Sequence, residues 1–185
     1  MKFSWAVLLL LVGLAIPRAS QAQVSVYGQF TATQLTNDLT NNFGTDYLYG
    51  ATAGVVYDGP TVLKRAILSA DIQAQYGAKS SGGERLVSAL VGPRLSVPFK
   101  RYKLAAYGDF LVGFGRYRDL SAGTSTLTAY STTDSLWGAK GGVAKQLTPR
   151  LDVVAEYEYV QYGMNDGEYN PMTFGGGVIF HFVKR

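Results

Sequence analysis

Hydrophobic and polar residues alternate one by one along most of the chain from Gln23 onward. In residues 66–76, for example, Ala66, Leu68, Ala70, Ile72, Ala74 and Tyr76 interleave with Ser69, Asp71, Gln73 and Gln75. Consecutive side chains of a β-strand point to opposite faces, so the alternation predicts strands with one apolar and one polar face. Eight segments have this character, near residues 23–35, 47–58, 64–76, 86–97, 103–117, 135–146, 150–162 and 172–182. Each is long enough to cross a lipid bilayer at a steep tilt.

The connecting segments also alternate, between short turns and longer loops. The short ones are 58–63, 98–102 and 146–149, and the longer ones, rich in Asn, Thr, Ser, Gly and Asp, are 36–46, 77–84, 117–134 and 163–171. Short turns at one end and longer loops at the other are typical of bacterial outer-membrane barrels, whose short turns face the periplasm. Weak strand character at 127–130 leaves a further hairpin in the third loop as an alternative.

Residues 1–22 have the character of an export signal. Lys2 supplies a positive start, residues 5–16 form an almost unbroken apolar run, and a small-residue cleavage site ends at Ala22. The alternative is an N-terminal membrane anchor, but a spanning helix needs roughly 20 apolar residues and this run is shorter. We therefore predict a signal peptide over 1–22 and a barrel domain over 23–185.

The composition narrows the possible functions. The chain has no cysteine, which excludes a disulfide framework and any thiolate metal site. Without Lys2 and Arg18, the basic residues fall from 17 to 15 against 13 acidic residues, and a net charge of +2 gives no reason to expect a nucleic-acid partner. No segment has a metal-ligand cluster, a glycine-rich phosphate loop or a nucleotide-binding motif, so we expect no cofactor, no metal and no catalytic residues.

The size of the side chains indicates which face meets lipid. The bulky face carries Leu104, Phe110, Val112, Phe114, Trp137, Val153, Tyr157, Tyr159, Met172, Phe174, Phe180 and Phe182. An eight-stranded barrel is just wide enough inside to be filled by side chains, so these would overfill it, whereas the mainly small and polar residues of the other face fit. The sequence therefore predicts an all-β fold, an eight-stranded antiparallel up-and-down transmembrane β-barrel. Its interfacial anchors would be Tyr49, Tyr57, Trp137, Tyr159 and Phe182.

Six charged residues point inward by the same alternation. They are Asp71, Arg94, Asp109, Lys140, Glu156 and Glu158, on five different predicted strands. Unpaired charges in a narrow lumen would be destabilising, so we predict a hydrogen-bonded ion-pair network that joins Arg94 and Lys140 to the four carboxylates. Glu156 and Glu158 lie two apart on one face, which also fits a pair of acid–base groups. We interpret them as acceptors for the two cations.

Charges at the two ends of the predicted barrel differ in sign. The periplasmic end collects Lys64, Arg65, Lys100, Arg101, Lys103, Lys145, Arg150, Lys184 and Arg185 against Asp58 and Asp152. The outer loops carry Asp38, Asp46, Glu84, Asp119, Asp134, Asp166 and Glu168 against Lys79, Arg85, Arg116 and Arg118. This asymmetry either orients the barrel or reflects two solvated rims.

Two segments carry a resemblance to a known family. Residues 90–96, Leu-Val-Gly-Pro-Arg-Leu-Ser, resemble the Gly-Pro-Arg strand signature of the small outer-membrane β-barrel family, the group that contains the transmembrane domain of outer membrane protein A. Residues 174–182, Phe-Gly-Gly-Gly-Val-Ile-Phe-His-Phe, resemble the last strand of that family. The similarity covers essentially the whole mature chain.

The resemblance implies partners. It implies that Phe174, Phe180 and Phe182 form the signal that the barrel-assembly machinery reads during insertion, although the family's signal often ends on a terminal aromatic and residues 183–185 follow here. Outer-membrane lipid and lipopolysaccharide would surround the barrel, and a barrel without an edge is expected to be a monomer. No peptidoglycan-binding domain follows the barrel, so a wall-tethering role is not implied.

Three functions remain compatible with the sequence. The first is a structural or surface-contact barrel that supports outer-membrane integrity, with a mostly plugged lumen and outer loops whose ligand the sequence does not identify. The second is a narrow porin-like channel for ions or small solutes. The third is a lipid A-modifying enzyme, which would need a serine beside the only histidine, His181. The inward charges favour the first because they would occlude a tight lumen, and we interpret His181 as a structural lumen residue.

Overall fold

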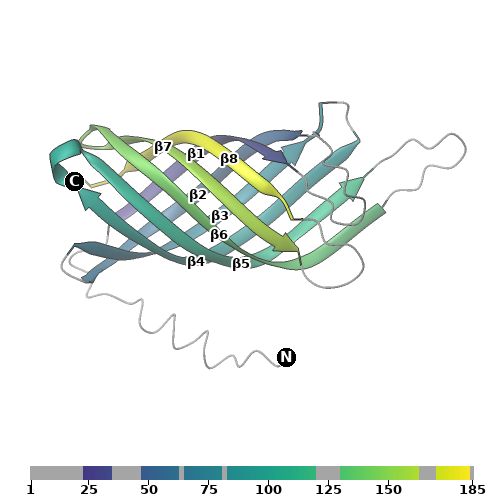
Figure 1. The fold of residues 1–185 in the computed structure, drawn as a ribbon, viewed down its shortest axis with the longest axis horizontal. Helices are drawn as coiled ribbons and strands as arrows, with labels where there is room; N and C mark the ends of the chain where they lie inside the picture. The colour runs from purple at the N-terminus through teal and green to yellow at the C-terminus, as the bar shows by residue number, and fades with distance from the viewer. Residues whose placement is uncertain are drawn as a thin grey trace, which may run out of the picture.

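The chain forms one closed barrel of eight antiparallel strands that follow one another in sequence order (Figure 1). The computed structural model describes residues 23–34, 47–62, 65–80, 83–119, 130–162 and 170–183. The predicted signal peptide, residues 1–22, lies outside these. Within the described part of the chain, no helix is long and apolar enough to cross a membrane.

All eight predicted strands are confirmed, most of them to within a few residues at each end. They are β1 (Gln23–Gln34), β2 (Tyr47–Val62), β3 (Ala66–Ala78), β4 (Glu84–Phe99), β5 (Leu104–Asp119), β6 (Tyr130–Thr148), β7 (Leu151–Tyr162) and β8 (Met172–His181). A short 3₁₀ helix, η1 (Lys100–Tyr102), joins β4 to β5. The largest difference is at β6, which begins at Tyr130 because the β5–β6 ladder continues to the pair Asp119–Tyr130. Of the 127–130 segment only Tyr130 lies within the described residues, and it belongs to β6.

Closure of the barrel comes from the pairing of the first strand with the last. β1 and β8 are antiparallel over a continuous register from Ser25–His181 to Gln34–Met172. Because every strand then has two neighbours, no row of backbone N–H and C=O groups is left at an edge. The connections β2–β3, β4–β5 and β6–β7 are the short ones, as the sequence predicts, and they share one end of the barrel.

The outer surface of the strands is apolar, as predicted. Phe30 and Phe114 have 85% and 70% of their surface exposed, and Phe110, Trp137, Phe174 and Phe182 are also exposed. Val112, Tyr159 and Met172, also predicted to face outward, are half-buried. A protein surface of this kind is expected where the strands meet lipid.

The lumen differs in one respect from the mainly small and polar interior that the sequence suggests. It also holds leucines, valines and tyrosines, among them Leu90, Leu111, Tyr27 and Tyr107. Glycines make the space for the two tyrosine rings. Tyr27 is paired with Gly54 and Tyr107 with Gly142, and a Cβ added at either glycine would lie within about 2.5 Å of the facing ring.

This close approach makes Gly142 a sensitive position. Gly142→Ala is expected to displace Tyr107 and to lower the free energy of unfolding by about 1–3 kcal/mol, as overpacking does elsewhere. Urea unfolding in detergent micelles, followed by the fluorescence of Trp137, measures the change. Gly141→Ala is the matched control, because its Cβ would meet only the Tyr107 backbone oxygen at 3.9 Å. Equal effects of the two substitutions would contradict the packing argument.

Candidate functional site

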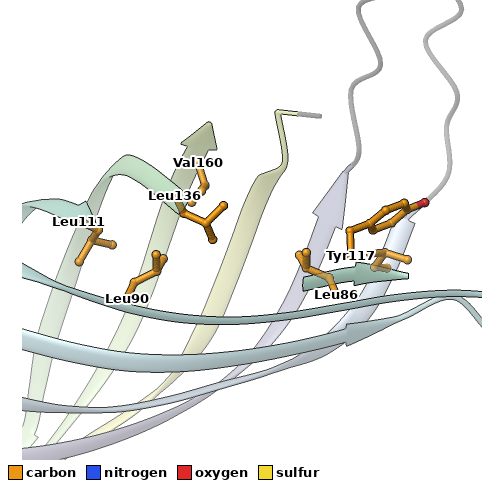
Figure 2. Packing of buried hydrophobic residues seen from close by; sticks show 7 residues of the cluster. Leu86, Leu90, Leu111, Tyr117, Leu136 and Val160 are labelled. Atoms are coloured by element: carbon orange, nitrogen blue, oxygen red, sulfur yellow. The ribbon is translucent and has the colours of Figure 1, made fainter. Parts of the chain in front are cut away.

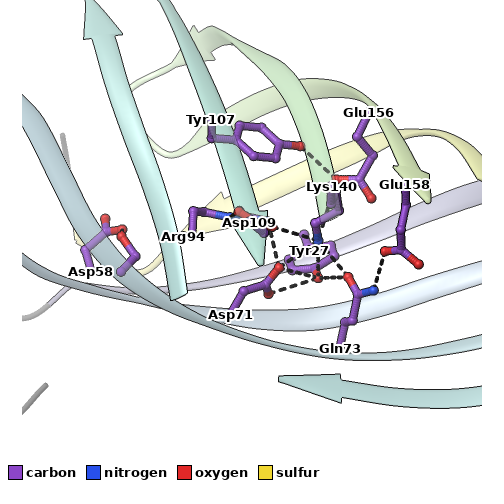
Figure 3. Close-up of polar contacts among 11 residues, drawn as sticks. Tyr27, Asp58, Asp71, Gln73, Arg94, Tyr107, Asp109, Lys140, Glu156 and Glu158 are labelled. Carbon is purple, nitrogen blue, oxygen red and sulfur yellow. Dashed lines mark hydrogen bonds and ion pairs between the residues drawn. The ribbon is translucent and has the colours of Figure 1, made fainter. Parts of the chain in front are cut away.

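Four charged side chains from four consecutive strands meet in the middle of the lumen (Figure 3). We call Asp71 on β3, Arg94 on β4, Asp109 on β5 and Lys140 on β6 the ion-pair core. Arg94 donates from Nε and Nη2 to the two carboxylate oxygens of Asp109, both at 2.9 Å, and its Nη2 also lies 2.8 Å from Asp71 Oδ2. The two-point contact with Asp109 fixes the orientation of the guanidinium as well as its charge.

Lys140 on β6 completes this core, and it is directly opposite Asp109 in the β5–β6 register. Its Nζ lies 2.7 Å from Asp71 Oδ2 and 3.2 Å from Asp109 Oδ2, so each carboxylate contacts both cations. Nζ also donates to Gln73 Oε1 at 2.6 Å and lies 3.8 Å from Glu156 Oε2. The side chains of Lys140, Asp71 and Asp109 have no exposed surface. Buried charges of this kind persist only when they are paired and hydrogen-bonded, as these are.

Two tyrosines also contact the charged core. The Tyr27 hydroxyl donates to Asp71 Oδ1 at 3.0 Å, and the Tyr107 hydroxyl donates to Glu156 Oε2 at 2.8 Å. The Arg94 guanidinium carbon lies 4.2 Å from the centroid of the Tyr107 ring, within cation–π range. The sequence interpretation did not select either tyrosine, although alternation places both on the inward face.

The six charged residues predicted to face the lumen are connected, but not all in the predicted way. Glu156 approaches Lys140, whereas Glu158 makes no ion pair with either cation among the described residues. Gln73 links it instead, because its Nε2 donates to Glu158 while its Oε1 accepts from Lys140. Glu158 is directly opposite Lys140 in the β6–β7 register, but the lysine side chain extends across the lumen towards Asp71. An amide therefore connects Glu158 to the core.

Hydrophobic side chains fill the lumen nearer the longer connections (Figure 2). This leucine cluster consists of Leu48, Leu86, Leu90, Leu111, Tyr117, Leu136 and Val160. A polar contact lies beside it, where Gln75 Nε2 is 3.2 Å from the hydroxyls of Thr33 and Thr173. Apolar packing and satisfied hydrogen bonds together close this part of the lumen.

The end of the barrel with the short connections holds a second polar contact, which crosses the strand pair that closes the barrel. His181 on β8 lies with Nδ1 2.7 Å from Ser25 Oγ on β1 and with Nε2 2.9 Å from Asp152 Oδ2 on β7. Ser25 and His181 are directly opposite in the β1–β8 register. We call these three residues the seam contact. Sequence reasoning expected His181 in the lumen but did not find its serine, which is distant in sequence and adjacent only after closure.

Serine, histidine and aspartate are the groups of a nucleophilic triad, so the seam contact has the residue types that a hydrolytic site would need. Ser25 and His181 are each only 1% exposed, and the cavity that both line has a volume of about 40 Å³. That volume suits water and not an acyl chain. An oxyanion hole would also require free backbone N–H groups beside Ser25. The backbone there is instead part of the hydrogen-bonded ladders to β2 and β8. The geometry therefore favours a structural role.

No group of three or more histidine, cysteine, aspartate or glutamate side chains in the described strands is arranged to hold a metal ion. The space at the end with the short connections is a vestibule of about 760 Å³, lined by Gln23, Asp58, Lys100 and Asp152 among others. It leads to the 40 Å³ cavity beside Arg94. The lumen thus narrows sharply before it reaches the ion-pair core.

The sequence and the fold are both similar to those of known outer-membrane proteins. The family described as outer membrane protein beta-barrel domain matches residues 6–182. The structure is similar to Neisserial surface protein A, with a TM-score of 0.62 and 15% identity over 88% of this chain and 100% of that one. It is also similar to Ail of Yersinia pestis (TM-score 0.51, 17% identity, 86% and 97% covered) and to the N-terminal barrel of OprF of Pseudomonas aeruginosa (0.50, 19%, 88% and 100%). Such low identities show the fold alone. No curated protein matches the sequence.

The ion-pair core leads to a prediction about stability. Lys140→Met is expected to lower the free energy of unfolding by about 3–5 kcal/mol, because Asp71 and Asp109 then share a single guanidinium. Urea unfolding in micelles measures it. Lys145→Met, an exposed position on the same strand, is the control and should change little. Asp71→Asn combined with Lys140→Met should recover part of the loss, and strictly additive effects would argue against the pairing.

The seam contact leads to a second prediction, which is tested by unfolding free energies and by chemical labelling of Ser25. Ser25→Ala and His181→Ala should show a coupling of about 1 kcal/mol in a double-mutant cycle of unfolding free energies, because each removes the other's partner. A fluorophosphonate probe should leave Ser25 unlabelled in the folded protein. Labelling that disappears in His181→Ala would instead make Ser25 an activated nucleophile.

Proposed function

The chain belongs to the outer membrane protein beta-barrel domain family, and from that premise we propose that it is a non-conducting barrel that supports the integrity of the outer membrane. The single observation that carries the proposal is the ion-pair core, in which Lys140 on β6 reaches across the lumen to Asp71 on β3 while Arg94 on β4 bridges Asp71 and Asp109. An eight-stranded barrel has little room beyond its own side chains. A hydrated path through the centre would have to break these ion pairs.

Side chains that fill the lumen on either side of the ion-pair core support the same proposal. The leucine cluster fills the lumen on one side of the core, and the seam contact narrows it on the other. A solute entering from the vestibule would meet the 40 Å³ cavity and then the guanidinium of Arg94. The alternative of a narrow porin-like channel would need all three obstacles to move together.

Orientation and surface contacts are part of the proposal. Exported chains of even strand number begin and end in the periplasm, so the short connections would face the periplasm and the longer ones the outside. The outer loops would then make whatever surface contacts the protein has. Phe174, Phe180 and Phe182 remain the predicted assembly signal. Their exposed rings, with Phe180 and Phe182 in edge-to-face contact at 5.6 Å between centroids, are consistent with recognition from outside the barrel.

Single-channel recording tests the absence of conduction. Exported protein purified from outer membranes, with folding checked by the gel shift between boiled and unboiled samples, should give a silent planar bilayer. Stable unit steps whose size changes in Arg94→Ala would establish a pore and overturn the proposal. Membrane integrity has its own test, since a deletion strain should become more sensitive to detergent and should recover when the wild-type chain is supplied.

A further inference from the structure

The vestibule at the end with the short connections has basic side chains around its opening. Lys100 and Lys103, on the β4–β5 connection, line the vestibule, and Arg65 and Arg101 line an adjoining space of about 650 Å³. The two spaces share lining residues, Lys100 among them, so they form one opening. All four side chains are exposed. We call these four residues the basic rim.

The basic rim has no acidic partner among its neighbours. None of its four side chains forms a hydrogen bond or an ion pair with another described residue, and Arg101 has only the ring of Tyr102, with its guanidinium carbon 5.8 Å from the ring centroid. Residues 63, 64, 184 and 185 adjoin this end in sequence and carry no acidic side chain. The rim therefore presents its positive charge to the solvent.

The two acidic residues at this end lie deeper in the vestibule. Asp58 is 6% exposed, borders the 40 Å³ cavity as well as the vestibule, and accepts a hydrogen bond from Ser69 Oγ at 2.9 Å. Asp152 is 4% exposed and contacts His181. The opening thus combines a basic rim with an acidic inner wall. An anionic ligand would be attracted to the rim and repelled from the lumen behind it.

Lys103 has a backbone conformation that stability alone does not favour. With φ of 51° and ψ of 39° it is left-handed, and it is the only non-glycine residue of the described chain with a positive φ. Its N–H donates to the Lys100 carbonyl at 3.2 Å, and its own carbonyl accepts from the Gln146 N–H at 2.9 Å, so both neighbours hold it there. Glycine adopts this conformation without a steric penalty. A lysine at such a position indicates that its side chain has a function.

Apolar side chains form the wall of the vestibule behind the rim. Ile67, Pro98 and Ala144 line both the vestibule and the 40 Å³ cavity, which places them on the lumen side of their strands. The volume of about 760 Å³ lies within the range of roughly 300–1,000 Å³ that is usual for ligand sites. Because the site lies inside the ring of strands, a ligand reaches it from water along the barrel axis and not from the lipid.

We propose that the vestibule binds an acidic peptide segment, whose carboxylates pair with Lys100 and Lys103 and whose apolar side chains contact Ile67 and Pro98. Charge complementarity with the rim selects the carboxylates, and the apolar wall selects the side chains between them. This partner goes beyond the proposed non-conducting role. Under the proposed orientation the segment would belong to a periplasmic protein, although binding itself does not depend on the orientation.

Fluorescence anisotropy with the full exported protein in a non-ionic detergent tests the site. The probe is an acetylated, fluorescein-labelled peptide in which glutamate and leucine alternate. It should bind the wild type, more weakly as the salt concentration rises, whereas a peptide with glutamine in place of glutamate should not bind. Lys103→Gly should weaken binding about fivefold, and Lys103→Gly combined with Lys100→Gln about tenfold or more, as expected for exposed ion pairs.

A second measurement separates a binding role of Lys103 from a structural one. The urea midpoint of Lys103→Gly should be at least as high as that of the wild type, because glycine relieves the left-handed conformation. Lys145→Gln is the matched control for charge. Lys145 is an exposed cation at the same end of the barrel, opposite Leu104 in the β5–β6 register, and it does not line the opening. This variant should leave binding unchanged.

Four results would overturn the proposal. They are the absence of binding to the wild type at low salt, an equal loss of binding in Lys145→Gln and Lys103→Gly, a lower urea midpoint in Lys103→Gly, and displacement of the peptide by phosphatidylglycerol or inorganic phosphate at equal concentration. Binding is measured in detergent and does not depend on conduction. A silent planar bilayer together with no peptide binding would overturn the site and leave the non-conducting proposal standing.

Discussion

Lipid offers no hydrogen-bonding partner to a backbone, and every other feature of this structure depends on that constraint. Each N–H and C=O of a spanning segment must be satisfied within the protein, which for strands requires a closed sheet. Pairing of β1 with β8 closes it. A closed barrel of eight strands then encloses a lumen so narrow that its own side chains must fill it. Closure therefore determines both the surface that meets lipid and the need for a packed interior.

Within that interior, the ion-pair core acts on strand register as well as on packing. Buried ion pairs are not by themselves a source of large net stability, since desolvation offsets much of their attraction. Exposure of the same charges to lipid, however, would be more destabilising than their burial in pairs. A slip of one residue in β4 or β6 would turn Arg94 or Lys140 into lipid, where an exposed cation is destabilising by about 2–4 kcal/mol near the midplane. One charge on each of β3, β4, β5 and β6 thus specifies one register among the alternatives.

The lumen and the outer surface carry different kinds of side chain. Inside, the leucine cluster, the ion-pair core and the seam contact succeed one another along the axis, and the cavity beside Arg94 and His181 has a volume of about 40 Å³. Outside, the apolar belt ends near the exposed Arg85, Arg116 and Arg118 at one end and near the exposed Lys100 and Arg101 at the other.

The alternation of residues was sufficient, by itself, to determine the eight strands, their approximate ends, the lipid-facing aromatics and the inward side of all six lumen charges. Period two is a local property, and side-chain size decides which face fits a narrow lumen. Contacts across the lumen depend instead on which strands closure brings together and on how far each side chain reaches. Only the tertiary structure could therefore reveal that Ser25 meets His181, that Gln73 stands between Lys140 and Glu158, and that Gly142 makes room for Tyr107. Ser25 and His181 become neighbours only when the first strand pairs with the last, whereas Tyr107 and Gly142 are brought together by the β5–β6 ladder.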